Sequence, residues 1–355
     1  MKRLSTKTNV LTTTLSIMLL VVLGACSQQE SSNNVAEISG EKLRSNPEAI
    51  YVGFAIDTLR EERWYRDKEA FEGAVNELGG EVKTLAANGN QDVQIQQVQL
   101  LINEGIDVLV VVPTDSDGSS EIVTLAHEAG IEVISYDRLI RGADLDYYLS
   151  FDNVKVGELQ AQELVNRVDE GIFAYVGGAE SDNNALLFRE GAMNILEPYI
   201  ESGSIELAYD SYTSGWDPVI ARDELRSFLE SSSIELDAVV AANDGTAGGV
   251  IEALGIRAGG TEVSGQDAEL EGIKRILDGT QTMTVYKSIE SIANSAAELA
   301  IDVANGNPVS TDTTIDNGEG EVPSILLEPI AVTADNIAET IIAEGHLTEE
   351  EIYDN

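Results

Sequence analysis

From Tyr51 onward, short apolar runs rich in β-branched residues alternate with longer segments in which apolar residues recur at helical spacing. Such runs predict strands, and strands that alternate with helices favour βαβ units with a parallel sheet. The predicted strands are Tyr51–Ile56, Val108–Val112, Val133–Tyr136, Tyr147–Phe151, Ile172–Val176, Ala238–Ala241 and Thr282–Tyr286. We therefore expect an α/β fold.

The segments between the strands predict helices, several of which end in a glycine that suits a C-terminal cap. The predicted helices are Trp64–Leu78, Val93–Glu104, Ser119–Ala129, Val154–Val168, Ala185–Tyr199, Asp217–Glu230, Thr246–Leu254, Leu270–Leu277 and Ser288–Ala304. The acidic stretch Asp312–Glu321 is expected to be a solvated loop. About 300 residues follow Ile50, which suits two domains better than one.

Polar side chains follow nearly every predicted strand. Asp137 and Arg138 come directly after Val133–Tyr136, at the end of the sheet where open parallel sheets bind ligands. A carboxylate beside a guanidinium can hold adjacent hydroxyls from two sides. A structural ion pair is the alternative for this pair alone, but the same arrangement recurs after other strands.

Planar hydrogen-bonding groups and both tryptophans of the chain, Trp64 and Trp216, fall at these junctions. A neutral sugar needs planar groups for its hydroxyls and an aromatic face for its C–H patches, whereas core packing is the alternative for the tryptophans. The candidate hydrogen-bonding groups are Asp137, Arg138, Asn184, Asn243, Asp267 and Lys287. This set predicts a sugar site.

Residues for catalysis or metal binding are poorly represented. The only histidines are His127 and His346, and the sequence contains neither G-x-x-x-x-G-K-[ST] nor G-x-G-x-x-G. Asp115–Gly118 resembles the start of a calcium loop but lacks the distal glutamate, so we interpret it as a capped helix entry. We expect no catalytic residue, no metal and no cofactor. A glycosidase that uses two of the many carboxylates is the alternative from another class.

The first 25 residues have the pattern of an export signal. Lys2, Arg3 and Lys7 precede an apolar run that ends in Leu23-Gly24-Ala25-Cys26, which resembles the lipobox of bacterial lipoproteins. Cys26 is the only cysteine, so we expect it to be lipidated and to anchor the protein on the extracytoplasmic face of the cell membrane. An uncleaved membrane anchor is the alternative. Residues 26–49 are polar and predict a flexible tether.

The chain is strongly acidic, with a formal net charge of −42. A surface of this sign repels phosphate backbones, so no nucleic acid partner is expected. We attribute the charge to solubility at high salt or high pH, although charge alone leaves a cationic ligand open.

Long motifs at the same junctions resemble the sugar-binding proteins of ABC transporters. They are AIDTLREERW, AANGNQ, SYDR, SFDNVKVGELQA, DNNALLFR, ANDGTAGG, SGQDAELEGIKRI and GTQTMTVYK, and the similarity runs from Tyr51 to about Glu344. PTDSDG is closer to the ribose and galactose relatives. Those of the ribose type have an amide where this chain has Val112, which argues against a ribose-like site.

The resemblance implies a type I periplasmic-binding-protein fold, with two Rossmann-like lobes of parallel sheets joined by a three-segment hinge. The implied N-terminal lobe is 50–153 plus 287–322, and the C-terminal lobe is 154–286 plus 323–347. The crossovers would lie near Asn153, Lys287 and Pro323.

Carried over position by position, the resemblance implies sugar contacts from both lobes and from the hinge. These are Arg63, Trp64, Asp137, Arg138, Asn184, Trp216, Asn243, Asp267 and Lys287. The implied ligand is a neutral monosaccharide. D-xylose is the first candidate, and another pentose or a hexose is the alternative. The implied partners are the membrane subunits of an ABC permease. A sugar-sensing subunit of a membrane receptor kinase is the alternative, whereas a repressor would begin with a helix-turn-helix.

Overall fold

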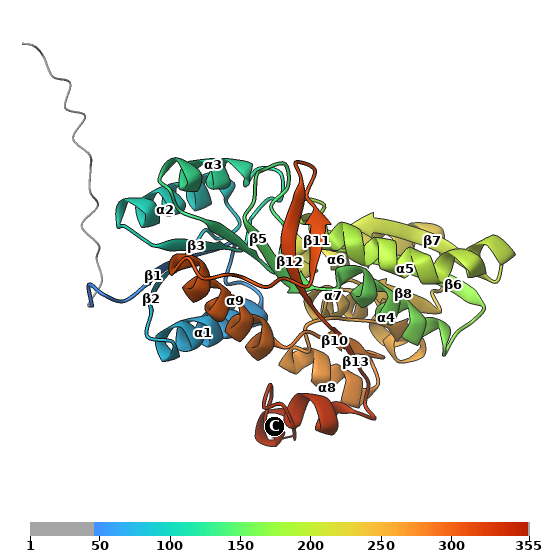
Figure 1. Ribbon diagram of the computed structural model, residues 1–355. Helices are drawn as coiled ribbons and strands as arrows, with labels where there is room; N and C mark the ends of the chain where they lie inside the picture. The colour runs from blue at the N-terminus through green and yellow to red at the C-terminus, as the bar shows by residue number, and fades with distance from the viewer. Residues whose placement is uncertain (1–45, 354–355) are drawn as a thin grey trace, which may run out of the picture. The chain divides into compact units, whose positions relative to one another are not determined.

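The computed structural model describes residues 46–353 and contains two parallel sheets (Figure 1). The first is seven-stranded, and we call this sheet with its helices the first lobe. Its order is β11 (Thr313–Asp316), β12 (Glu321–Leu327), β5 (Tyr147–Phe151), β4 (Val133–Tyr136), β3 (Val108–Val111), β1 (Tyr51–Ile56) and β2 (Glu81–Ala86). All pairings are parallel except that of β11 with β12.

The second sheet has four strands, and we call it with its helices the second lobe. Its order is β7 (Ile205–Tyr212), β6 (Gly171–Gly177), β8 (Ala238–Ala241) and β9 (Glu262–Val263), all parallel. A separate antiparallel pair joins β10 (Thr284–Tyr286) to β13 (Ile330–Val332).

Helices cover both faces of each sheet, which is why the central strands are predominantly apolar rather than alternating. On the first sheet, α1 (Glu62–Glu77) and α9 (Ile289–Ala304) pack on one face, and α2 (Gln91–Asn103) and α3 (Ser120–Glu128) on the other. On the second, α4 (Asn153–Val165) and α5 (Asn183–Ser202) oppose α6 (Pro218–Ser232) and α7 (Asp244–Leu254).

Helix α8 (Leu270–Asp278) packs with the C-terminal segment, which contains the π-helix Ala338–Ile342 and the short helix α10 (Glu349–Tyr353). Two short 3-10 turns, Ser214–Trp216 and Gly255–Gly260, complete the second lobe.

Two glycines bring α4 and α5 into backbone contact. A Cβ on Gly157 would lie 1.9 Å from the carbonyl oxygen of Phe188, and a Cβ on Gly191 would lie 1.9 Å from that of Val154. Only glycine fits at either position, and the close approach holds the N-terminal turn of α5 beside the first crossover.

The predicted helices and strands are confirmed within a few residues, but β2, β7, β9, β11, β12 and β13 were not predicted. β2 is half-buried along its whole length and β7 is mostly half-buried, so neither has the continuous apolar run that marks a buried strand. The prediction of a solvated loop at Asp312–Glu321 is wrong in part, because β11 and the start of β12 form an antiparallel hairpin there.

Two boundaries differ from expectation. β12 contains Pro323 and pairs with β5 as far as Leu327, so the chain leaves the first sheet after Leu327 rather than near Pro323. At the other end, the Asn46 N–H donates to Glu81 Oε1 at 2.8 Å and Ala49 is buried, so the last residues assigned to the tether pack on the first lobe. The other lobe bounds stay predictions.

The predicted signal peptide, residues 1–25, and the predicted lipidation site Cys26 lie outside the described residues. Within residues 46–353, no helix is both long and apolar enough to cross a membrane.

Candidate functional site

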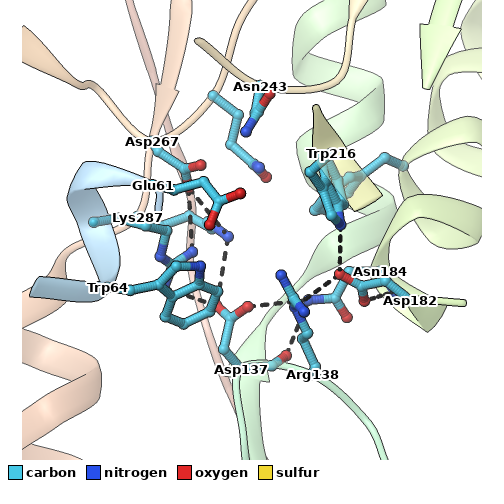
Figure 2. A pocket seen from close by; sticks show the side chains of 13 residues that line it. Glu61, Trp64, Asp137, Arg138, Asp182, Asn184, Trp216, Asn243, Asp267 and Lys287 are labelled. Carbon is cyan, nitrogen blue, oxygen red and sulfur yellow. Dashed lines mark hydrogen bonds and ion pairs between the residues drawn. The ribbon is translucent and has the colours of Figure 1, made fainter. Parts of the chain in front are cut away.

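All nine residues predicted as ligand contacts line one pocket between the two lobes (Figure 2). Each stands at the start of a helix or just beyond a strand, at the carboxyl edge of its sheet. The first lobe supplies Arg63, Trp64, Asp137 and Arg138, the second supplies Asn184, Trp216, Asn243 and Asp267, and Lys287 follows β10. The sequence pattern thus brought these side chains together, although their role as ligand contacts stays a prediction.

Four further residues line the pocket and were not predicted: Glu61, Asp182, Phe188 and Gln266. Three of them are within two residues of a predicted contact, and Phe188 lies four residues after Asn184 on the same face of α5. Sequence spacing could therefore have indicated Phe188. Nothing in the sequence distinguished the other three from ordinary loop polarity.

Arg63 is the centre of a buried ion-pair cluster. Its Nη2 donates to Asp137 Oδ2 at 3.0 Å, its Nη1 to Asp267 Oδ1 at 3.2 Å, and its Nε to Asp67 Oδ2 at 3.1 Å. Asp67 and Asp137 belong to the same lobe as Arg63, so these two carboxylates orient the planar guanidinium before any ligand arrives. Lys287 Nζ lies 3.4 Å from both Asp137 Oδ2 and Asp267 Oδ1.

The two cations keep Asp137 ionised. Burial alone would raise the pKa of Asp137, but the charges of Arg63 and Lys287 outweigh it, and the pKa is lowered to about 2. Asp137 therefore accepts hydrogen bonds at neutral pH and does not act as an acid there.

Arg138 joins the lobes on the other side of the pocket. Its Nη1 donates to Asp57 Oδ2 at 2.8 Å, and its Nε lies 2.8 Å from Asp182 Oδ2 of the second lobe. The Trp216 indole N–H donates to the same Asp182 oxygen at 3.2 Å, as Figure 2 shows. The guanidinium of Arg138 also lies 5.1 Å from the centre of the Trp64 ring, within cation–π range.

Two pocket carboxylates sit on strained backbone. Asp137 has φ 61° and Asp267 has φ 91°, a left-handed region that costs a non-glycine residue about 1–3 kcal/mol. The Asp137 carbonyl accepts from Ser150 Oγ at 2.6 Å and Asn184 Nδ2 at 3.0 Å, which compensates for the strain. Strain of this kind persists where a side chain must be aimed at a ligand.

The side chains nearly fill the pocket. The remaining cavity measures about 20 Å³ for a water-sized sphere, which is room for about one water molecule. A monosaccharide is larger than this, so it enters only if the lobes separate or the ion pairs rearrange.

The pocket offers planar donors and acceptors with aromatic faces, which suits recognition of a polyhydroxy compound. Within residues 46–353, no cluster of three or more His, Cys, Asp or Glu side chains is placed to hold a metal ion. His127 contacts Asp146 on the first lobe, and His346 lies in the C-terminal segment, so neither lines the pocket.

Comparisons with known proteins match this chain to periplasmic binding proteins. The family described as "Periplasmic binding protein domain" matches residues 52–308. The D-xylose-binding periplasmic protein of Escherichia coli (strain K12) is 46% identical, and the alignment covers 87% of this chain and 94% of that protein. The multiple sugar-binding periplasmic receptor ChvE of Rhizobium radiobacter is 35% identical, with 83% of this chain and 90% of the receptor covered.

Among solved structures, a carbohydrate transporter solute-binding protein from Chloroflexus aurantiacus in complex with D-glucose is similar. It has a TM-score of 0.80 and 30% sequence identity, and the match covers 84% of this chain and 97% of that one. The expected type I periplasmic-binding-protein fold is confirmed.

Proposed function

The chain belongs to the periplasmic binding protein family, and on this premise we propose that it captures a neutral monosaccharide, D-xylose first, between its two lobes. The observation that carries the proposal is the convergence of nine polar or aromatic side chains from both lobes in one pocket. The 46% identity to a D-xylose-binding periplasmic protein supports xylose as the first sugar to test.

In this proposal the charged planar groups bind hydroxyls, and the tryptophans cover the ring faces. Asp137, Arg138 and Asp267 would each exchange part of an ion pair for hydrogen bonds to the sugar. Because ion pairs already orient these groups, the sugar has to order few side chains when it binds. Trp64 and Trp216 would contact its C–H patches.

The proposed role is transport without chemical conversion of the sugar. The protein would deliver its ligand to the membrane subunits of an ABC permease, held on the extracytoplasmic face by lipidated Cys26. A Cys26→Ala variant should be released into the medium or remain as precursor. Retention of a processed Cys26→Ala protein at the membrane would contradict the anchor and leave sugar binding untouched.

A hexose is the second candidate ligand, because a similar solved structure holds D-glucose and a relative is named for binding multiple sugars. Titration calorimetry of residues 27–355 with D-xylose, D-ribose and D-glucose separates these cases. We expect D-xylose to bind most tightly. If D-glucose binds most tightly, the protein still binds sugars, but D-xylose is not its preferred ligand. If no sugar gives a heat of binding, the proposal is rejected.

A further inference from the structure

Glu61 stands at the N-terminal end of α1 but does not cap that helix with its side chain. It is the N-cap residue of α1, where a short polar side chain normally accepts a hydrogen bond from the first turn of the helix. The Glu61 side chain makes no such bond. It lines the pocket instead, as Figure 2 shows. Departures from local rules are expected at functional or strained sites.

One oxygen of the Glu61 carboxylate is held by its neighbour in the chain. Arg60 donates to Glu61 Oε1 from Nη2 at 2.7 Å and from Nε at 3.2 Å. The same Nη2 also donates to the carbonyl oxygen of Gly215. Gly215 belongs to the second lobe and directly precedes Trp216 in the chain. Arg60 therefore touches the second lobe while it orients a carboxylate of the first.

The other oxygen of Glu61 has no partner. Among the described residues, Glu61 Oε2 and Gln266 Oε1 are the pocket atoms that are buried without a hydrogen bond. A buried acceptor left unpaired costs about 1–3 kcal/mol, and more when it is charged. Both atoms accept hydrogen bonds, and they come from opposite lobes. A sugar hydroxyl is the complementary donor.

The remaining pocket carboxylates differ from Glu61 in this respect. Asp137, Asp182 and Asp267 each lie within 3.4 Å of at least one cation that also lines the pocket. A sugar competes with those cations for the carboxylate oxygens, whereas Glu61 Oε2 is free of such competition.

We propose that Glu61 Oε2 accepts a hydrogen bond from one hydroxyl of the bound sugar, and that Arg60 is a positioning residue that presents this carboxylate when the lobes close. The proposal rests on the proposed function and adds a ligand contact to it. Because Arg60 also contacts Gly215 of the second lobe, closure fixes the Arg60 side chain and, through it, the Glu61 carboxylate. Closure therefore strengthens sugar binding through the Glu61 hydrogen bond as well as through the contacts of the sugar with the second lobe.

A series of deoxy sugars tests the contact. Glu61→Gln keeps the length of the side chain and an acceptor for Arg60, but removes the charge. We expect this variant to bind D-xylose about tenfold more weakly than the wild type, as for loss of one charge-assisted hydrogen bond. For the one deoxy-xylose that lacks the contacted hydroxyl, wild type and variant should bind within about twofold of each other.

Arg60→Ala should bind D-xylose as weakly as Glu61→Gln does, and should bind that one deoxy-xylose within about twofold of the wild type. Arg60 itself does not line the pocket. The double variant should bind D-xylose no more weakly than the weaker single variant, because both changes remove one contact. Arg141→Ala is the matched control, since Arg141 is also a partly exposed arginine beside a carboxylate, Asp117, and lies outside the pocket. It should leave affinity unchanged, and thermal melting should confirm that each variant is folded.

Two results would overturn the proposal while the wild type still binds D-xylose. One is a Glu61→Gln affinity within about twofold of the wild type. The other is an equal penalty for every deoxy-xylose, which would make Glu61 a structural group. If the wild type binds no monosaccharide, the proposed function fails, and this contact fails with it.

Discussion

Arg63 and Asp267 are 204 residues apart in the chain, yet Arg63 Nη1 donates to Asp267 Oδ1 at 3.2 Å across the pocket. Arg63 lies in the first turn of α1, and Asp267 follows the last strand of the second sheet. Both side chains are buried. This bond ties the lobes together through the residues expected to bind the ligand. The energy of closure and the energy of binding are therefore linked.

Asp267→Asn should weaken D-xylose binding about ten- to a hundredfold, because a hydrogen bond to a charged group contributes about 1.5–3 kcal/mol. Arg63 keeps two other carboxylate partners, so the fold should survive. Calorimetry gives the affinity and thermal melting gives the stability. Asp278→Asn, on the exposed end of α8, is the control. An Asp267→Asn affinity within about twofold of the wild type would remove Asp267 from the set of contacts.

Arg66→Ala should weaken sugar binding without touching the pocket. Arg66 Nη1 donates to the carbonyl oxygen of His346 at 2.9 Å, and so links α1 to the C-terminal segment that packs on α8. Loss of this link should favour the open state and lower the D-xylose affinity about two- to fivefold, as expected for a shift in the closed population.

Small-angle scattering checks the same effect. Saturating D-xylose should reduce the radius of gyration of the wild type and of Arg66→Ala, with more sugar needed for the variant. Lys68→Ala, which removes a cation from the same helix, should behave as the wild type. An unchanged scattering profile for the wild type at saturating sugar would argue against closure.

Tryptophan fluorescence should report binding directly. Trp64 and Trp216 are the only tryptophans of the chain, and both line the pocket. D-xylose should therefore shift the emission, and Trp216→Phe should remove a large part of the shift. That variant also deprives Asp182 of its indole donor, so a modest loss of affinity is expected. If emission stays constant while calorimetry detects binding, the sugar lies away from the indoles.

Asp244 should make stability depend on pH in the acidic range. It is fully buried, and burial raises its pKa from 3.8 to about 7, although Arg275 acts in the opposite direction. Its carboxylate accepts from Gln281 Nε2, Thr284 Oγ1 and the Glu269 N–H, at 2.6, 3.0 and 2.9 Å. Because burial raises the pKa of Asp244 despite these hydrogen bonds, the folded protein binds the Asp244 proton more tightly than the unfolded chain does.

The stabilisation from that proton is complete below pH 3.8 and is lost as the pH rises to about 7. Asp244→Asn removes the titration, so its free energy of unfolding relative to the wild type should rise by about 2–4 kcal/mol between pH 4 and pH 8. Urea unfolding at both pH values measures the difference. A constant difference would show that Asp244 does not titrate in this range.

Much of the fold followed from local pattern. A strand buried on both faces is predominantly apolar along its length, so β1, β4, β5 and β8 could be located to the residue. Edge strands escape this rule because one side meets solvent. For that reason β2, β7 and β11 were recognised only in three dimensions. β12 lies inside the first sheet, but it contains Pro323 and is largely half-buried, so its sequence did not mark it as a strand either.

The nine candidate contacts could be named from the sequence because parallel strands and their following helices bring their polar ends to one edge of each sheet. That rule says which residues come together and not how they pair. The three carboxylates that orient Arg63 come from its own helix, from the end of β4 and from the second lobe. Their pairing depends on rotamers and on contacts between residues far apart in the chain.

The sequence by itself therefore determined the α/β class, the order of the central strands along the chain and the chemical types gathered at the site. Tertiary structure alone decided that Pro323 stays in the first sheet, that Asp182 bridges Arg138 and Trp216, and that Glu61 faces the pocket rather than its own helix. The physical reason is the separation along the chain over which each effect acts. Periodicity and burial act over a few residues, whereas strand pairing, ion pairing and the direction of a long side chain depend on which distant groups the folded chain places nearby.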